Sequence, residues 1–162
     1  MKVISNTGPI IGLAKIGRIE LLRSMFGEVL IPPLVHKELY GKIGCESGQI
    51  DQALNDFIHV EDLRPLRPEV EEAIAHLDEG EKQAIGLATT FGGNALLLLD
   101  DRAGRGAAQK LNIPVTGLIG ILLLGKERGL VDSVGYLIAE LRKNRYWLSD
   151  EAMDAAKRLA GE

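Results

Sequence analysis

Two adjacent carboxylates, Asp100 and Asp101, are the first candidates for chemistry in this chain. They follow residues 95–99, an apolar run without alternation that is too short for a typical helix and therefore predicts a strand buried on both faces. Ligands of open α/β sheets bind at the carboxyl ends of the strands, and two carboxylates placed there repel each other unless a cation or a proton intervenes. The structural alternative is that the aspartates cap a helix that begins near Arg102.

Three further positions carry oxygen donors in comparable places: Asn6, Glu38 and Glu81. Asn6 follows the first predicted strand and Glu38 lies on a helix that follows the second, but Asn6 can also close a turn and Glu38 can be an ordinary solvated residue. Glu81 lies in the first turn of another predicted helix, where it also fits a capping box with Asp78. Clustered at one edge of a parallel sheet, such donors suit Mg²⁺ or Mn²⁺.

The elements that must position these residues alternate along the chain. Strands are predicted around Val3-Ile4 and at residues 28–31, 57–60, 95–99 and 113–115. Helices are expected from Pro9, placed at the first helical position, and over residues 19–25, 34–40, 49–56, 68–77, 79–91, 102–111, 117–128, 133–143 and 149–159. This order predicts an α/β fold in which a mostly parallel sheet carries helices on both faces, and one domain over residues 1–162.

Composition limits the function classes. The net charge of −4 gives no overall basic field for nucleic acid, although a local basic strip is compatible with it. The single cysteine, Cys45, excludes an intrachain disulfide and has no histidine partner nearby in sequence, and the three histidines show no paired ligand spacing. We expect no signal peptide, no membrane span and a cytoplasmic location, because no apolar run reaches the roughly 18 residues that a span requires.

Four short motifs together resemble the PIN-domain family over about residues 1–130. They are the stretches 3–10 (VISNTGPI), 31–39 (IPPLVHKEL), 77–85 (LDEGEKQAI) and 98–102 (LLDDR). The resemblance is closest to small prokaryotic PIN proteins, many of them VapC-like toxins of toxin–antitoxin pairs. It implies a three-layer α/β/α fold, hydrolysis of RNA phosphodiesters with Mg²⁺ or Mn²⁺, frequent homodimers and a small antitoxin protein as partner.

Carried over by position, the family's catalytic and metal-binding set falls on Asn6, Glu38, Glu81 and Asp101, with Asp100 as an adjacent metal ligand. The departure is at Asn6, where the family usually has Asp, so the cation loses one negative ligand. Thr7 is then a candidate for binding a phosphate or a metal-bound water.

Two segments are candidates for contact with RNA. Arg102 and Arg105 lie in a segment without acids and are substrate-binding candidates, against the alternative of a solvated helix face. Residues 143–147, with Tyr146 and Trp147, could stack on bases or form an interface. The nearly all-apolar segment 117–128 predicts a homodimer, unless the following helices cover it.

Two other functions compete with the ribonuclease. Asn6 motivates a non-catalytic PIN-like module that binds RNA or an antitoxin. A phosphoacceptor receiver-like domain is disfavoured, because it requires acids after the first strand and a lysine after the last one, where this chain has Asn6 and residues 115–117 (VTG).

Overall fold

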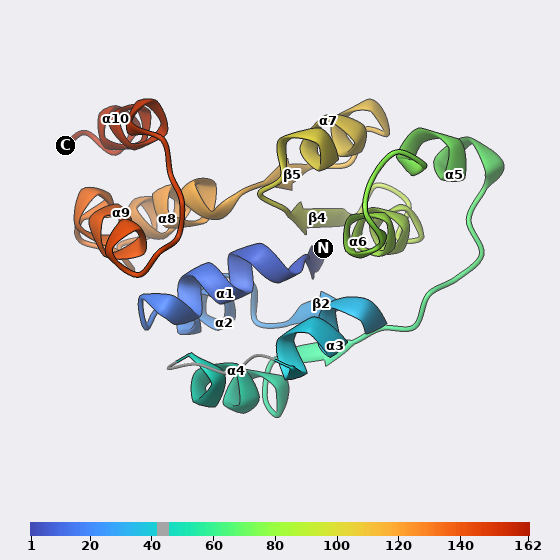
Figure 1. Cartoon of the computed structure of the whole chain (residues 1–162), viewed down its shortest axis with the longest axis horizontal. Coiled ribbons are helices and arrows are strands. Elements are labelled where there is room, and N and C mark those ends of the chain that lie inside the picture. Colours follow the sequence, from blue (N-terminus) through green and yellow to red (C-terminus); the bar gives the residue numbers. More distant parts are fainter. Residues whose placement is uncertain (42–45) are drawn as a thin grey trace.

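The computed structural model describes residues 1–41 and 46–162, and Cys45 lies outside the described residues. Five strands of the described chain form one sheet in the order β3-β2-β1-β4-β5 (Figure 1). The strands are β1 (Lys2–Ser5), β2 (Val29–Ile31), β3 (Ile58–Val60), β4 (Ala95–Leu98) and β5 (Val115–Thr116). Every neighbouring pair is parallel, so the prediction of a parallel α/β sheet is confirmed.

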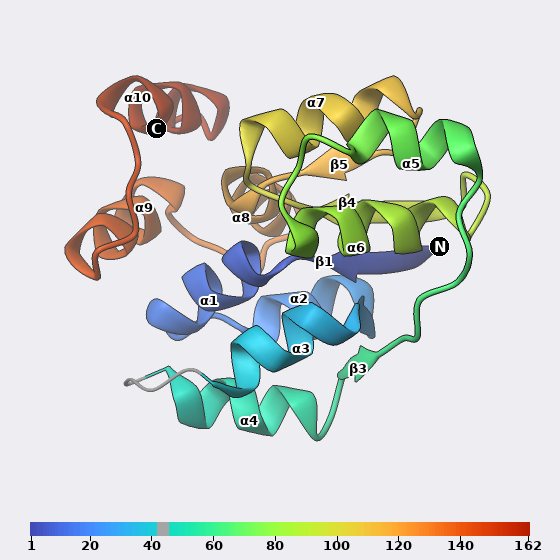
Figure 2. The ribbon, with the colours of Figure 1, turned by 45° about the vertical axis from the view of Figure 1, so that its right-hand side comes forward.

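Helices occupy both faces of this sheet. They are α1 (Thr7–Lys15), α2 (Glu20–Phe26), α3 (Pro33–Tyr40), α4 (Ser47–Leu54), α5 (Pro68–Ile74), α6 (Glu79–Thr89), α7 (Arg102–Lys110), α8 (Leu118–Glu127), α9 (Val134–Lys143) and α10 (Asp150–Leu159). In Figure 2, α5, α6 and α7 gather on one side of the strands, whereas α1 to α4 gather on another. None of the helices in the described part of the chain is long and apolar enough to cross a membrane.

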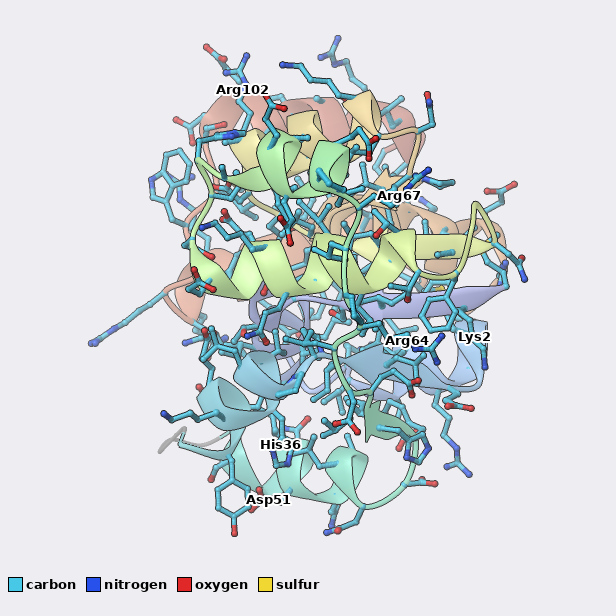
Figure 3. The ribbon with its side chains drawn as sticks, turned by 90° about the vertical axis from the view of Figure 1, so that its right-hand side faces the viewer. Lys2, His36, Asp51, Arg64, Arg67 and Arg102 are labelled. Atoms are coloured by element: carbon cyan, nitrogen blue, oxygen red, sulfur yellow. The ribbon has the colours of Figure 1, made fainter. Side chains whose placement is uncertain are left out.

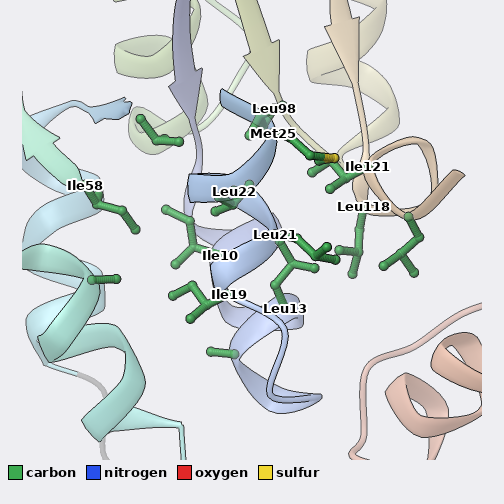
Figure 4. Close-up of a cluster of buried hydrophobic side chains, with 14 of the residues drawn as sticks. Ile10, Leu13, Ile19, Leu21, Leu22, Met25, Ile58, Leu98, Leu118 and Ile121 are labelled. Atoms are coloured by element: carbon green, nitrogen blue, oxygen red, sulfur yellow. The ribbon is translucent and has the colours of Figure 1, made fainter. Parts of the chain in front are cut away.

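Alternate residues of the strands supply two separate cores. Ile4, Leu30 and Leu97 pack with α5, α6 and α7, on the side that faces the viewer in Figure 3. Their neighbours Val3 and Leu98 pack in the other core, with residues of α1, α2 and α8 (Figure 4). Because Leu97, Leu98 and Leu99 are all fully buried, the prediction that this run is a strand covered on both faces is confirmed.

Several predicted boundaries were wrong by a few residues. The first helix begins at Thr7, so Pro9 occupies its third position rather than its first, which the helix tolerates because the first four N–H groups have no partner within it. The last strand is Val115–Thr116 rather than residues 113–115, and Pro114 contributes only its carbonyl, which accepts from the Leu97 N–H at 2.9 Å.

The C-terminal helices cover much of α8. Leu118, Ile121 and Leu122 are buried, and Ile119, Leu123 and Leu124 pack partly buried against the first core. The Glu162 carboxylate accepts hydrogen bonds from the N–H groups of Val134 and Gly135 at the start of α9. Contacts within the chain therefore account for most of the apolar surface of the 117–128 segment.

Candidate functional site

The end of β1 and the helix α3 meet at one point of the carboxyl edge, the edge of the sheet where the strands end. Asn6 occupies the N-cap position of α1 with an extended backbone, but its side chain makes no capping hydrogen bond. The Thr7 hydroxyl donates to Glu38 Oε2 at 2.5 Å. Glu38 is exposed, yet it has a partner 31 residues away, so it is more than a solvated helix residue.

The first turn of α6 lies against this pair through Gly80. A Cβ at Gly80 would lie 3.3 Å from Glu38 Oε1, 3.5 Å from Asn6 Oδ1 and 3.6 Å from Asp78 Oδ1. Three oxygens from three different elements thus surround one buried glycine. Any side chain at this position would enter the space that the oxygens share.

Glu81 has the structural role that its spacing predicted. Its N–H donates to Asp78 Oδ1 at 2.8 Å, and its Oε2 accepts from the Asp78 N–H at 3.3 Å, which together form a capping box. Burial raises the pKa of the Glu81 carboxyl, and the negative charges of Asp101 and Asp78 raise it further. A helix cap alone does not require a second carboxylate to face Glu81, so the repulsion from Asp101 marks a place where a cation is favoured.

The two aspartates after β4 differ in their surroundings. Asp101 is the N-cap of α7, because its Oδ2 accepts from the Gly104 N–H at 2.8 Å. Asp100 points the other way, with Oδ1 accepting from the Leu118 N–H at 2.6 Å and Oδ2 accepting from the Tyr146 hydroxyl. Only Asp101 faces Glu81, whereas both oxygens of Asp100 already bond to the start of α8 and to the C-terminal segment.

Tyr146 is a participant whose role the sequence did not reveal. Its ring lies 3.0 Å from where a Cβ at Gly12 would stand, and burial together with the charge of Asp100 raises the pKa of its hydroxyl, which therefore stays a donor. Of the two alternatives for residues 143–147, a contact with the rest of the chain describes Tyr146, because its ring packs against α1 and its hydroxyl bonds to Asp100. No local pattern links Tyr146 to Asp100, which is 46 residues away.

The acidic cluster, defined as Asn6, Glu38, Asp78, Glu81 and Asp101, has the donor chemistry of a hard cation site. None of its carboxylates forms an ion pair within the described ranges 1–41 and 46–162. Within these described ranges, no group of three or more His, Cys, Asp or Glu side chains is already arranged to hold a metal ion. The donors therefore fit Mg²⁺ or Mn²⁺ in kind, but they stand as two groups: Asn6, Glu38 and Asp78 meet around Gly80, and Glu81 faces Asp101.

A groove beside Asp101 holds the two predicted substrate-binding arginines. We call it the Arg–Trp groove; it encloses about 710 Å³ and is lined by Asp101, Arg102, Arg105, Trp147 and residues at the start of α8 and α10. The histidines lie apart from it: His36 packs its ring against Tyr40, with the ring centroids 5.8 Å apart.

A parallel α/β sheet that carries a cluster of acids at its carboxyl edge is the arrangement expected of a PIN-like nuclease fold. The family model DUF3368, a PIN domain, matches residues 2–162, and the chain belongs to this family. PIN domains are generally nucleases, so the fold is of a nuclease type. No curated protein and no solved structure matched the chain.

Proposed function

We propose that this protein is a ribonuclease that hydrolyses RNA phosphodiesters with Mg²⁺ or Mn²⁺ bound in the acidic cluster. The observation that carries the proposal is the meeting of Asn6 Oδ1, Glu38 Oε1 and Asp78 Oδ1 around Gly80. Membership of the PIN family also supports the proposal, because PIN domains are generally nucleases. Asn6, Glu38, Glu81 and Asp101 would hold the ion, which supplies Lewis-acid activation of water and phosphate.

The chain's own residues prepare this site. Thr7 holds Glu38 by a hydrogen bond and would be close enough to the cluster to bind a phosphate, and the cap bond from Gly104 holds Asp101. Asp100, with both oxygens bonded, serves as a support for the cluster rather than as its leading ligand. The raised pKa of Glu81 gives the site a pH-dependent charge, since protons compete with the cation for that carboxylate.

The test is hydrolysis of a single-stranded RNA of mixed sequence with Mn²⁺, with Mg²⁺ and with EDTA. Glu38→Gln and Asp101→Asn should each lower the rate by about tenfold or more, since even residues that only support metal ligands cost 10–100-fold. Glu72→Gln, which changes an exposed acid of α5, is the matched control and should leave the rate unchanged. Equal rates for all three variants, or hydrolysis that persists in EDTA, would remove the acidic cluster from the reaction.

A second function has its own support. Asn6 brings no charge, and the described residues contain no ready group of three acids, which together favour a catalytically weakened module that binds RNA or an antitoxin. The two functions separate in one experiment: the module binds RNA but leaves it intact at millimolar Mn²⁺. Hydrolysis that depends on Glu38 and Asp101 excludes it.

We further propose that the chain acts as one unit over residues 1–162 and as the toxin of a toxin–antitoxin pair. The motif resemblance supports the toxin, and the bond from Tyr146 to Asp100 joins the C-terminal segment to the site. Expression should arrest growth, whereas expression of Asp101→Asn should not, and a small neighbouring reading frame should relieve the arrest. Growth that is unaffected by an active, folded enzyme would exclude the toxin.

A homodimer is the last part of this proposal. A groove of about 660 Å³ beside α8, lined by Leu123, Leu124 and Leu159 among others, leaves apolar surface open to a second copy. Leu159 is 74% exposed. Light scattering should give twice the chain mass, and Leu159→Lys should give the single mass; a wild-type monomer at every concentration contradicts the dimer.

A further inference from the structure

The Arg–Trp groove is next to the acidic cluster and shares Asp101 with it, but its other walls come from later parts of the chain. One wall comes from the start of α7, with Asp101, Arg102 and Arg105, and another comes from residues 146–149 before α10. Because Asp101 belongs to both the groove and the cluster, a linear polymer bound in the groove would pass next to the cluster.

The two arginines of the groove have unused donors. In the part of the chain that the structure describes, neither Arg102 nor Arg105 forms an ion pair or a side-chain hydrogen bond. Arg105 Nη1 lies only 3.2 Å from where a Cβ at Gly117 would stand, so the glycine leaves the guanidinium room inside the groove. Figure 3 shows Arg102 projecting outward near the end of the molecule. Planar guanidinium groups with free donors are suited to phosphate oxygens.

Trp147 contributes a different chemistry to the same groove. Trp147 is 83% exposed, whereas tryptophan residues are on average largely buried in folded proteins. The residues on either side are fixed, since Tyr146 bonds to Asp100 and Leu148 packs against the first core. The chain therefore holds the backbone of Trp147 in place and leaves its ring free, which is how a stacking platform for a base is presented.

We propose that the Arg–Trp groove binds single-stranded RNA, with a base stacked on Trp147 and the neighbouring phosphates bound by Arg102 and Arg105. The inference rests on the proposed ribonuclease and names the residues of this chain that would hold its RNA beside the acidic cluster. A base can reach an indole face only when it is unstacked from its neighbours, so the groove selects single strands over duplexes. The overall charge of −4 does not exclude this, because Arg102 and Arg105 place two cationic groups in the groove beside Asp100 and Asp101, whose charges a bound cation would offset.

The experiment uses the fluorescence of Trp147, which is the only tryptophan of the chain. The full-length protein is titrated with an oligouridylate and with an RNA duplex of equal length, both in EDTA so that no metal-dependent hydrolysis occurs. Single-stranded RNA should quench the emission, and the duplex should not. The apparent Kd should rise with salt, as expected for phosphate contacts.

Variants separate the two contacts. Arg102→Gln combined with Arg105→Gln should weaken binding about tenfold and reduce the salt dependence, and Trp147→Ala should weaken it by a similar factor, measured by anisotropy of a labelled oligonucleotide. Trp147→Phe should retain most of the affinity. Arg67→Gln is the matched control, because Arg67 lies beside Gly92, Gly93 and Ala95 at the opposite edge of the sheet.

The outcomes distinguish this inference from the proposed function. Quenching in EDTA without hydrolysis in Mn²⁺ supports the groove and contradicts the ribonuclease, whereas hydrolysis that Trp147→Ala and the double arginine variant leave unchanged contradicts the groove alone. Equal quenching by the duplex overturns the single-strand assignment. Absence of RNA binding, together with a lower mass of Trp147→Ala in light scattering, would make the groove a protein interface and overturn the inference.

Discussion

Replacing Gly80 with alanine should separate the stability of the protein from its affinity for a cation. Gly80 is the second residue of α6, and alanine favours a helix over glycine by about 0.5–1 kcal/mol. For a chain of this length that gain corresponds to roughly 1–4 °C in Tm without metal. The added Cβ, however, would stand 3.3 Å from Glu38 Oε1, closer than an ordinary contact, so the flexible Glu38 carboxylate must move away from Asn6.

Displacement of the Glu38 carboxylate should weaken cation binding and therefore reduce the increase in Tm that the cation causes. A cation that binds only the folded protein stabilises it by RT ln(1 + [L]/Kd), so each tenfold rise in Kd removes about 1.4 kcal/mol of that stabilisation. For Gly80→Ala, we therefore expect the Tm increase at saturating Mn²⁺ to shrink by about 3–6 °C, measured by differential scanning calorimetry.

The matched control is Gly106→Ala. Gly106 lies within α7, and a Cβ there meets no atom within 4 Å, so this change brings the helical gain without the contact. It should raise the Tm without metal and leave the response to Mn²⁺ unchanged. If Gly80→Ala responds to Mn²⁺ as the wild type does, the cation does not lie between Asn6 and Glu38, and the reasoning from the cluster fails.

Four further predictions concern single side chains. Asn6→Asp should bind Mn²⁺ more tightly in calorimetry and cleave RNA faster. Without metal its Tm should be lower, because the added carboxylate repels its acidic neighbours. Unchanged binding and cleavage would remove Asn6 from the site. Because the folded state raises the pKa of Glu81, its protonated form favours folding, and stability falls as the pH rises through that pKa. Glu81→Gln should therefore raise the Tm at neutral pH, with no gain below pH 4.5. Glu162 is the opposite case: the hydrogen bond from Lys126, followed by those from Ser133, Gly135 and Val134, lowers the pKa of its carboxyl to about 2. Glu162→Gln should therefore have a lower Tm than the wild type at neutral pH, and this difference should vanish as the pH falls from 4.5 toward 2. Tyr146→Phe leaves Asp100 without one donor and should lower the free energy of unfolding by about 1–3 kcal/mol in urea, whereas an unchanged urea midpoint would mean that this bond does not hold the segment.

Local patterns were sufficient to predict the sheet and most of its helices. The uniform apolar run before Asp100 identified the central strand, and the spacing of Asp78 and Glu81 identified the start of α6, because both signals lie within a few residues. Predicted helix boundaries were wrong where a local rule allowed more than one start. Proline is accepted at several positions in the first turn of a helix, so Pro9 did not determine where α1 begins.

The candidate site was only partly predictable. Strand ends in a parallel sheet meet at one edge, so the approach of Asn6 to Glu38 followed from the order of the elements. The division between Asp100 and Asp101 did not follow from it, because it depends on Tyr146 and on the start of α8, which are set by tertiary packing. Adjacent residues of a strand end point in opposite directions, but the sequence does not say which one faces the other acids.

The position of residues 146–149 late in the chain has a consequence during translation. Residues 6 to 101 supply all donors of the acidic cluster, whereas the wall of the groove that carries Trp147 is synthesised 45 or more residues later. During translation, a growing chain would thus contain every residue of the acidic cluster well before this wall of the groove exists. If the groove binds RNA as proposed, the nascent chain gains this surface only after residues 146–149 have been synthesised and held in place by the bond from Tyr146 to Asp100.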